Sequence, residues 1–266
     1  MKKMILVLAA TLICGACVFT SCKKDKNNTD LNLKEKIIGK WITADVDGQP
    51  LTTNEKKAIT FVSTTKAYIS AAFNANPEIG AHWINQMEAA VAIDGNKVTV
   101  TTHPDEHTTL VEELTVTAIN DSELTANRKL TATIDGNIVD TKEETVRYVK
   151  LTADYSEAIL GTWQGHCTSE GSVFDDGQEH RWEYRADGSY VYYAKDGENW
   201  VPYATSTLSE YFVDGTLLCT RWIDNGQENR EWWEITIDGT QMHWTALRQD
   251  ANGQRFTATF EMEKVN

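Results

Sequence analysis

Proline and glycine are scarce in this chain, with four and 16 among 266 residues. Such low contents exclude a collagen-like or low-complexity protein. The mean hydropathy of −0.42 excludes a polytopic membrane protein. The length is sufficient for one large domain or for two domains of ordinary size.

Positive charge is also in short supply. The chain has 25 Lys and Arg against 39 Asp and Glu, a formal net charge of −14. Without residues 1–21, which carry Lys2, Lys3 and no acid, the balance is 23 against 39, or −16. A body of this charge repels phosphate backbones and anionic lipid surfaces, so we expect no nucleic-acid partner.

Motifs that carry catalysis are missing. The chain has no Gly-x-Ser-x-Gly and no His-Glu-x-x-His sequence, and it has no Cys-x-x-Cys after residue 21. His103 and His107 have a spacing that metal ligands use, but their polar segment favours a solvated turn. Paired acids are common in so acidic a chain, and two pairs are expected to face solvent: Glu112 with Glu113, and Glu143 with Glu144. We therefore expect no enzyme activity, no cofactor and no metal site.

The N-terminus has the pattern of an export signal. Lys2 and Lys3 precede an apolar run, Met4–Val18, which is too short to span a bilayer comfortably as a helix. After Cys22 the chain turns abruptly polar. Ser21, a small residue directly before this cysteine, resembles part of the lipobox of bacterial lipoproteins, in which the cysteine becomes the lipidated N-terminus.

The resemblance implies a signal peptide over residues 1–21, lipidation of Cys22 and a flexible tether over residues 22–33. A protein anchored by lipid in the outer membrane follows from this, facing the periplasm or the cell surface, with the membrane as its partner. Two alternatives stay open, which are cleavage before Cys17 and an ordinary secretory signal with an incidental cysteine.

The body of the chain has the pattern of many short antiparallel strands. Asp-Gly and Asn-Gly pairs, which tolerate positive φ, are the strongest short-range signal for hairpins between alternating apolar runs. Lys97–Thr101 and Phe256–Met262 are two such runs. Ten of the pairs occur, at Gly48, Gly95, Gly136, Gly177, Gly188, Gly197, Gly215, Gly226, Gly239 and Gly253. Helical periodicity is confined to three short stretches, Leu31–Ile38, Asp154–Leu160 and Asn76–Glu88.

The body also contains an internal repeat. Ile37–Trp41 matches Ile159–Trp163 at an offset of 122 residues, and a short helix-like stretch precedes each copy. A repeat of this length indicates duplicated domains, each large enough to bury a core. We expect domains over residues 34–152 and 153–266.

The Gly-x-Trp sequence at the start of each copy resembles the first-strand signature of lipocalins. With the lipobox and the hairpins, the chain is similar to bacterial lipocalin-like lipoproteins with two tandem domains. The resemblance implies an all-β protein of two antiparallel up-and-down β-barrels, each with a short N-terminal helical turn. It also implies that a basic residue on the last strand closes one end of each barrel over the tryptophan. Here those pairs are Trp41 with Lys150, and Trp163 with Lys264, with lysine in place of the usual arginine.

Two cysteines remain in the body of the chain, Cys167 and Cys219, both in the second copy. An exported protein can form disulfides. Cys167 has the strand parity of Trp163 and is expected to point inward, and Cys219 alternates with Leu217 in the same sense. Either a disulfide or two buried free thiols is compatible with these positions.

Aromatic residues are concentrated in the second copy, which holds seven of the nine tryptophans and seven of the nine tyrosines. Adjacent Trp232 and Trp233 must face opposite sides of one strand. Ile235 and Ile237 are in phase with Trp233, so Trp232 is the outward one, exposed or covered by the other domain. The candidate contacts for a ligand or partner are Trp222, Trp232, Trp244 and Tyr192.

These features favour a lipid-anchored binding protein of lipocalin-like type for a small or apolar ligand. Two alternatives are a surface module that binds a glycan or protein through exposed aromatics, and a structural envelope lipoprotein without a ligand. A cavity above about 300 Å³ in the second barrel would favour the first function.

Overall fold

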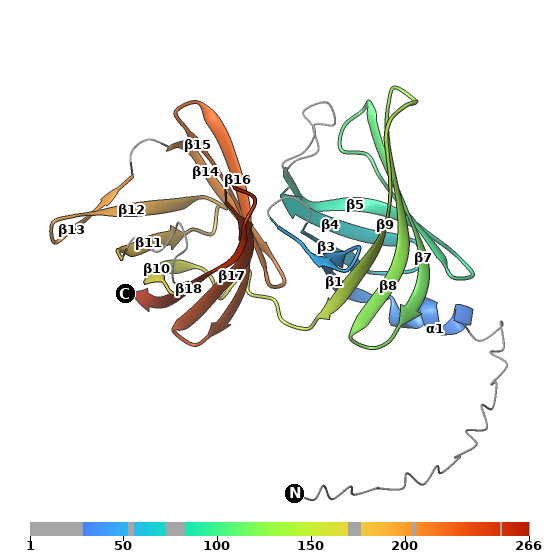
Figure 1. Cartoon of the computed structure of the whole chain (residues 1–266), viewed down its shortest axis with the longest axis horizontal. Helices are drawn as coiled ribbons and strands as arrows, with labels where there is room; N and C mark the ends of the chain where they lie inside the picture. Colours follow the sequence, from blue (N-terminus) through green and yellow to red (C-terminus); the bar gives the residue numbers. More distant parts are fainter. Residues whose placement is uncertain are drawn as a thin grey trace, which may run out of the picture.

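The computed structural model describes residues 29–52, 56–72, 83–169, 177–203, 206–250 and 252–265. Within these ranges the chain forms one helix, α1 (Thr29–Lys36), and eighteen strands. The strands make two antiparallel barrel-like domains side by side (Figure 1). The expected all-β fold with two tandem domains is therefore confirmed.

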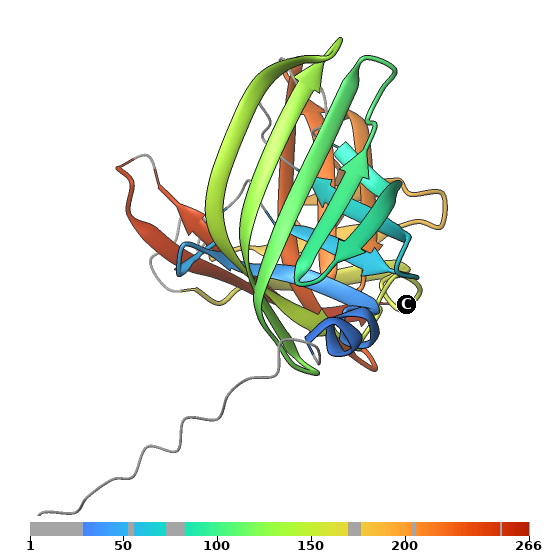
Figure 2. The ribbon, with the colours of Figure 1, turned by 90° about the vertical axis from the view of Figure 1, so that its right-hand side faces the viewer.

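The first domain is a closed barrel. From β3 to β9 its strands follow one another in chain order, β1 pairs with β3 and with β9 to close the barrel, and the short β2 pairs with β1. α1 lies at one end of this barrel (Figure 2), where Leu33 and Ile37 join the apolar core around Trp41. The strands are β1 (Gly39–Val46), β2 (Gln49–Pro50), β3 (Lys57–Phe61), β4 (Lys66–Ala72), β5 (Trp83–Asp94), β6 (Lys97–Thr102), β7 (Thr108–Ile119), β8 (Glu123–Ile134) and β9 (Asn137–Leu151).

The second domain is a half-barrel. Its sheet has the order β13-β12-β11-β10-β18-β17-β16-β15-β14, which leaves a seam between β12 and β14. Among the residues described, β-type pairing across this seam is confined to one bridge, between Ser189 and Glu210. The strands are β10 (Gly161–Cys167), β11 (Glu179–Tyr184), β12 (Tyr190–Asp196), β13 (Asn199–Pro202), β14 (Ser206–Asp214), β15 (Leu217–Asp224), β16 (Gln227–Asp238), β17 (Gln241–Gln249) and β18 (Arg255–Val265).

The glycine has a positive φ at all ten Asp-Gly and Asn-Gly positions, the conformation expected for turns. At the β8–β9 hairpin both Asp135 (φ 49°) and Gly136 (φ 76°) adopt this left-handed conformation. Two successive residues of positive φ make a type I′ turn, whose twist matches that of the flanking strands.

Each domain has a tryptophan and a lysine paired across its first and last strands. Trp41 on β1 lies opposite Lys150 on β9, and Trp163 on β10 lies opposite Lys264 on β18. Both indole rings are buried, with exposed fractions of 1% and 0%. The duplicated arrangement makes the end of each domain a rigid, packed closure.

The outer face of β14–β16 packs against the first barrel. Trp83 meets Phe212 edge-on with 4.8 Å between ring centres. Lys56 pairs with Glu234 at 2.5 Å and lies over the Trp232 ring at 5.2 Å. At a second contact, Lys40 of the first domain forms ion pairs with Asp154 and with the fully buried Asp214 of the second. The two domains therefore share an apolar interface with ion pairs on it.

Two local expectations need correction and a third is confirmed. α1 begins at Thr29, so the tether expected over residues 22–33 already enters the helix. The expected helix over Asn76–Glu88 is wrong where it is described, because β5 starts at Trp83. The segment Asp154–Leu160 makes the short helical turn expected before the second domain, closed by Ile159 N donating to Tyr155 O at 3.0 Å.

The expected export signal and the expected lipidation site, Cys22, lie outside the described residues. In the described part of the chain, no helix has the length and apolar character to cross a membrane.

Candidate ligand cavity

The inner face of the half-barrel encloses a cavity of about 740 Å³. Its walls come from β11 to β18 on both sides of the seam, because alternate residues of each strand point inward. Eight aromatic side chains make up half of the lining: Trp182, Tyr190, Tyr192, Tyr203, Trp222, Trp233, Trp244 and Phe260. In the described part of the chain, the aliphatic residues of the lining are Val191, Pro202 and Leu208.

Four of these rings form a continuous cluster at the base of the cavity. Trp244 lies 4.8 Å from Trp182, 5.4 Å from Trp233 and 5.7 Å from Phe260, measured between ring centres. The planes are inclined to one another by between 45° and 51° at these contacts. Tilted rings enclose a volume from several sides, whereas coplanar rings would make a flat platform.

Polar groups are few, and most of them are paired. His180 Nδ1 lies 2.9 Å from the Tyr192 hydroxyl. Arg185 donates to both oxygens of Glu183, at 2.8 and 3.2 Å. Burial raises the pKa of Tyr190 well above its ordinary value, and the charge of Glu231 raises it further. A ligand in this cavity therefore meets aromatic rings and a small number of fixed polar atoms.

Glu231 is the one carboxylate that lines the cavity among the described residues, and its side chain is 25% exposed. It lies on β16 in phase with Trp233, whose indole N–H donates to Glu231 Oε1 at 3.0 Å. Alternate residues of a strand share a face, so Glu231 and Trp233 both point from β16 into the cavity.

Arg248 lies next to Glu231, at the place where β16 and β17 are no longer paired. The pairing of β16 with β17 ends at Glu234 and Thr245, and Arg248 Nη2 donates to the carbonyl of Trp232 at 2.9 Å beyond that point. The same nitrogen lies 3.3 Å from Glu231 Oε2. Burial lowers the pKa of Arg248 while Glu231 opposes that shift. The guanidinium therefore fills the gap between two strands and neutralises part of the Glu231 charge.

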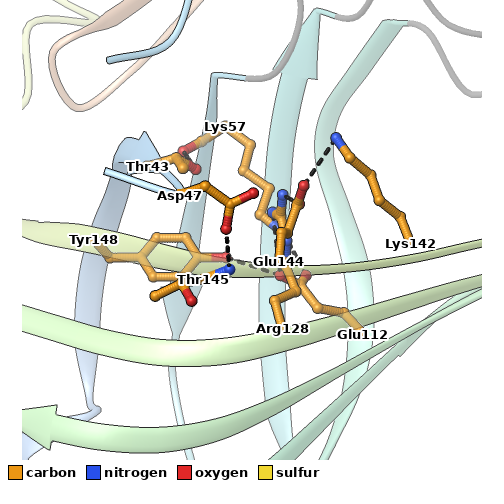
Figure 3. Close-up of polar contacts among 9 residues, drawn as sticks. All are labelled: Thr43, Asp47, Lys57, Glu112, Arg128, Lys142, Glu144, Thr145 and Tyr148. Atoms are coloured by element: carbon orange, nitrogen blue, oxygen red, sulfur yellow. Dashed lines mark hydrogen bonds and ion pairs between the residues drawn. The ribbon is translucent and has the colours of Figure 1, made fainter. Parts of the chain in front are cut away.

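The first barrel has a different interior. Above its apolar layer, Lys57, Glu112, Arg128 and Glu144 converge in a buried ionic cluster (Figure 3). Lys57 pairs with Glu112, Arg128 pairs with Glu144, and Arg128 Nη1 lies 3.6 Å from Glu112. The Tyr148 hydroxyl donates to Glu112 at 2.8 Å. This cluster crosses the barrel and occupies its interior with side chains.

The electrostatics of the cluster favour a charged Glu112. Burial alone would raise the pKa of this carboxyl group, but the charges of Lys57 and Arg128, with the hydrogen bonds from Lys57 and Tyr148, lower it to about 2. Burial lowers the pKa of Lys57, against the attraction of Glu112. The expectation that Glu112 and Glu144 face solvent is wrong, since only their neighbours Glu113 and Glu143 do.

The cavity brings together three of the four aromatic residues singled out from the sequence, Trp222, Trp244 and Tyr192. Trp232 lies on the opposite side of the sheet, as its strand parity predicts, but it is 2% exposed because the first barrel covers it. It is not an accessible contact for a partner. The sequence did not single out Trp182, His180 or Glu231, although the parity of Trp233 places Glu231 on the same face.

Both cysteines are buried free thiols, so the alternative of a disulfide is wrong. Cys167 is on β10 opposite Phe260, and its sulfur lies 3.0 Å from Ser169 Oγ. Cys219 is on β15 and faces the first barrel instead of its own, next to Ala72. Burial raises the pKa of Cys219 well above its ordinary value.

The histidine pair with metal-like spacing does not converge on a shared point. His103 Nδ1 lies 3.1 Å from Thr109 Oγ1, and His107 Nδ1 lies 2.7 Å from Asp135. In the ranges that the structure describes, no group of three or more His, Cys, Asp or Glu could hold a metal ion.

Comparisons with known proteins add little to this geometry. No family model matches the sequence, and a search of curated proteins finds no match. Among solved structures, the chain is similar to a protein of unknown function from the DUF3598 family of Nostoc punctiforme, with 9% identity, 89% of this chain and 99% of that chain covered, and a TM-score of 0.23. It is also similar to the vaccine antigen Transferrin Binding Protein B of Haemophilus parasuis, with 9% identity, coverage of 82% and 61%, and a TM-score of 0.23. Neither likeness carries an argument about function at that TM-score.

Proposed function

We propose that this chain is a binding protein that holds a small ligand in the cavity of its second domain. The observation that carries the proposal is the 740 Å³ volume enclosed by eight aromatic side chains. Ligand sites are concave, mostly apolar, and about 300–1,000 Å³ in volume, with a few fixed polar groups. The cavity meets each of these conditions.

The contrast between the domains supports this function. The interior of the first barrel is occupied by apolar side chains and the ionic cluster of Lys57, Glu112, Arg128 and Glu144. The second domain has the more aromatic interior and the open seam between β12 and β14. We assign ligand binding to the second domain, and to the first domain the role of a packed partner that supports β14–β16.

The proposal includes the lipocalin-like family and the lipid anchor. A tryptophan and a lysine paired at the closed end of each domain support the resemblance to lipocalins. The polar boundary at Cys22 supports lipidation there and a place in the outer membrane, facing the periplasm or the cell surface. We propose binding without catalysis, because the described residues of the lining include one carboxylate and one histidine, and that histidine is paired with Tyr192.

Native mass spectrometry of the protein purified from its own host tests the proposal. We expect an additional bound mass in the wild type, with several-fold lower occupancy in Trp222→Leu, which removes one aromatic wall. The matched control is Trp200→Leu, in the same domain but outside the cavity, where the ring packs against Arg181 and Lys195. Equal occupancy in both variants would place the ligand elsewhere, and an unliganded wild type would favour a structural lipoprotein.

A further inference from the structure

The tryptophans of this chain divide into two groups by whether a cation covers the ring. Six of the nine have a Lys or Arg within 6 Å of the ring centre: Trp41, Trp83, Trp163, Trp200, Trp232 and Trp233. Across the described residues, the three that have none are Trp182, Trp222 and Trp244, and all three line the cavity. A fourth tryptophan of the cavity, Trp233, has Arg248 over its ring, so the cation is missing at three of the four tryptophans that the described lining contains.

The faces of these rings are negative in potential. An aromatic ring carries a quadrupole with electron density above and below its plane, which attracts a cation, and the attraction is strongest for tryptophan and in a site shielded from water. The Trp182 and Trp244 rings contact each other with planes inclined by 51°, and both line the cavity together with Trp222. A compact positive group in this volume would therefore lie close to three tryptophan rings.

The second domain adds net negative charge around this cavity. Residues 153–266 hold 20 Asp and Glu against 8 Lys and Arg, a net charge of −12 out of −14 for the whole chain. Glu231 contributes a carboxylate at the cavity wall, with its side chain 25% exposed. An acidic domain concentrates cations near its surface, and low-dielectric walls strengthen the effect inside a cleft.

The two arginines near the cavity are already bound by acids. Arg185 makes two hydrogen bonds with Glu183. Arg248 is 4% exposed, and its guanidinium lies over Trp233, 4.2 Å from the ring centre. Its Nη2 donates hydrogen bonds to the Trp232 carbonyl and to Glu231. Each guanidinium charge is therefore partly neutralised by a neighbouring carboxylate.

From these observations we infer that the cavity selects an organic cation, a small molecule with an ammonium group that lies against Trp182, Trp222 and Trp244 near Glu231. This inference rests on the proposed function and names its ligand class. The described residues give the lining three aliphatic side chains against eight aromatic ones, so these walls do not favour an alkyl chain over a cation. The tilted rings do not present the flat platform on which a sugar ring stacks.

Paired titrations with choline and its neutral isostere, 3,3-dimethylbutan-1-ol, test the inference on the full chain. The two compounds have the same shape and differ in one charge. Intrinsic tryptophan fluorescence and calorimetry report binding. We expect choline to bind at least about tenfold more tightly than the isostere, because the rings and Glu231 act on its charge.

Two Glu→Gln substitutions, each removing one negative charge, distinguish binding in the cavity from attraction of choline by the net charge of the domain. Glu231→Gln removes the cavity carboxylate, and Glu263→Gln removes an exposed one on β18 of the same domain. We expect Glu231→Gln to reduce choline affinity by about tenfold with little change for the isostere, and Glu263→Gln to change neither. If thermal melting shows that Glu231→Gln is unfolded, Trp222→Leu takes its place, and we expect it to lower the affinity for choline more than the affinity for the isostere.

The contrary outcomes distinguish this inference from the proposed function. Equal or tighter binding of the isostere would overturn the cation class and leave a small-ligand site in place. Failure of both compounds to bind would also overturn the cation class, and a neutral mass bound to the protein from its host would then preserve the proposed function. An equal loss of choline affinity in Glu231→Gln and Glu263→Gln would show attraction by net charge without a site.

Discussion

Lys264 Nζ lies 5.1 Å from the centre of the Trp163 ring, and the Trp163 indole N–H donates to the carbonyl of Ile159 at 2.6 Å. The first barrel repeats both contacts with the same distances, through Lys150, Trp41 and Ile37. A glycine precedes each tryptophan by two residues, at a φ of +116° in the second domain. A Cβ on that glycine, Gly161, would approach Lys264 Cε to 2.9 Å. Gly-x-Trp and lysine therefore form one packing unit.

The first prediction concerns this unit. Trp163→Ala should lower the free energy of unfolding by about 3–5 kcal/mol, because a fully buried ring is lost and a cavity remains. Trp200→Ala, at a partly exposed ring outside the core, should cost about 1 kcal/mol or less. Urea unfolding of both variants measures the difference. Similar losses in the two variants would contradict the closing role of Trp163.

The second prediction concerns the ionic cluster of the first barrel. Glu112→Gln should destabilise the protein by about 3–5 kcal/mol, because it leaves the buried Lys57 and Arg128 with too little negative charge. The matched control is Glu113→Gln, at the adjacent position on the outer face, which should cost about 1 kcal/mol or less. Denaturant unfolding of both variants at neutral pH tests the contrast.

The same carboxylate gives the stability a pH dependence of known sign. The folded-state pKa of Glu112, about 2, lies below the ordinary value of 4.5, so the folded state binds fewer protons here than the unfolded state. Its contribution is complete above about pH 5 and is lost as the pH falls from 4.5 toward 2. Unfolding curves between pH 6 and 2.5 should show this loss in the wild type and a smaller one in Glu112→Gln. Parallel curves would show that Glu112 is not the group responsible.

Local signals allowed much of the fold to be predicted from the sequence. The Asp-Gly and Asn-Gly turns are determined by the φ of a few adjacent residues, and the parity of Trp233 with Ile235 correctly separates the two faces of β16. Parity does not show what covers a face. Trp232 is buried by Lys56 and its neighbours, which are more than 170 residues away in the chain, and no local pattern contains that contact.

The ionic cluster escaped prediction, and the sequence could not distinguish a cavity from a filled barrel, for a related reason. Glu112 follows the alternation of β7 and is in phase with buried Leu114, but a pair of adjacent acids in an acidic chain gives no sign of the cations opposite. Whether eight aromatic rings fill a barrel or line a cavity depends on the separation of β12 and β14. That separation is a property of the whole sheet.

The third prediction concerns the N-terminus, which lies outside the described residues. Cys22→Ser should release the protein from the membrane fraction into the soluble fraction, because the thioether-linked lipid would be lost. Cys17→Ser is the matched control and should leave retention unchanged if cleavage occurs before Cys22. Fractionation with immunoblotting measures both. Retention that is lost in Cys17→Ser instead would move the lipidation site, and a soluble wild type would exclude an anchor.

The last prediction concerns Trp232 and the interface between the domains. In the full chain its ring is buried under Lys56, so Trp232→Ala should cost about 2–4 kcal/mol. In a fragment of residues 153–266 the covering barrel is absent, the ring is exposed, and the same change should cost about 1 kcal/mol or less.

We expect the fragment to unfold cooperatively, because most of its apolar core lies within β10–β18, but to aggregate more readily through exposed Trp232, Phe212 and Cys219. Urea unfolding of the four proteins, with light scattering, measures both effects. An equal cost in the two contexts would mean that Trp232 packs within its own domain, and a fragment without a cooperative transition would mean that the two barrels fold as one unit.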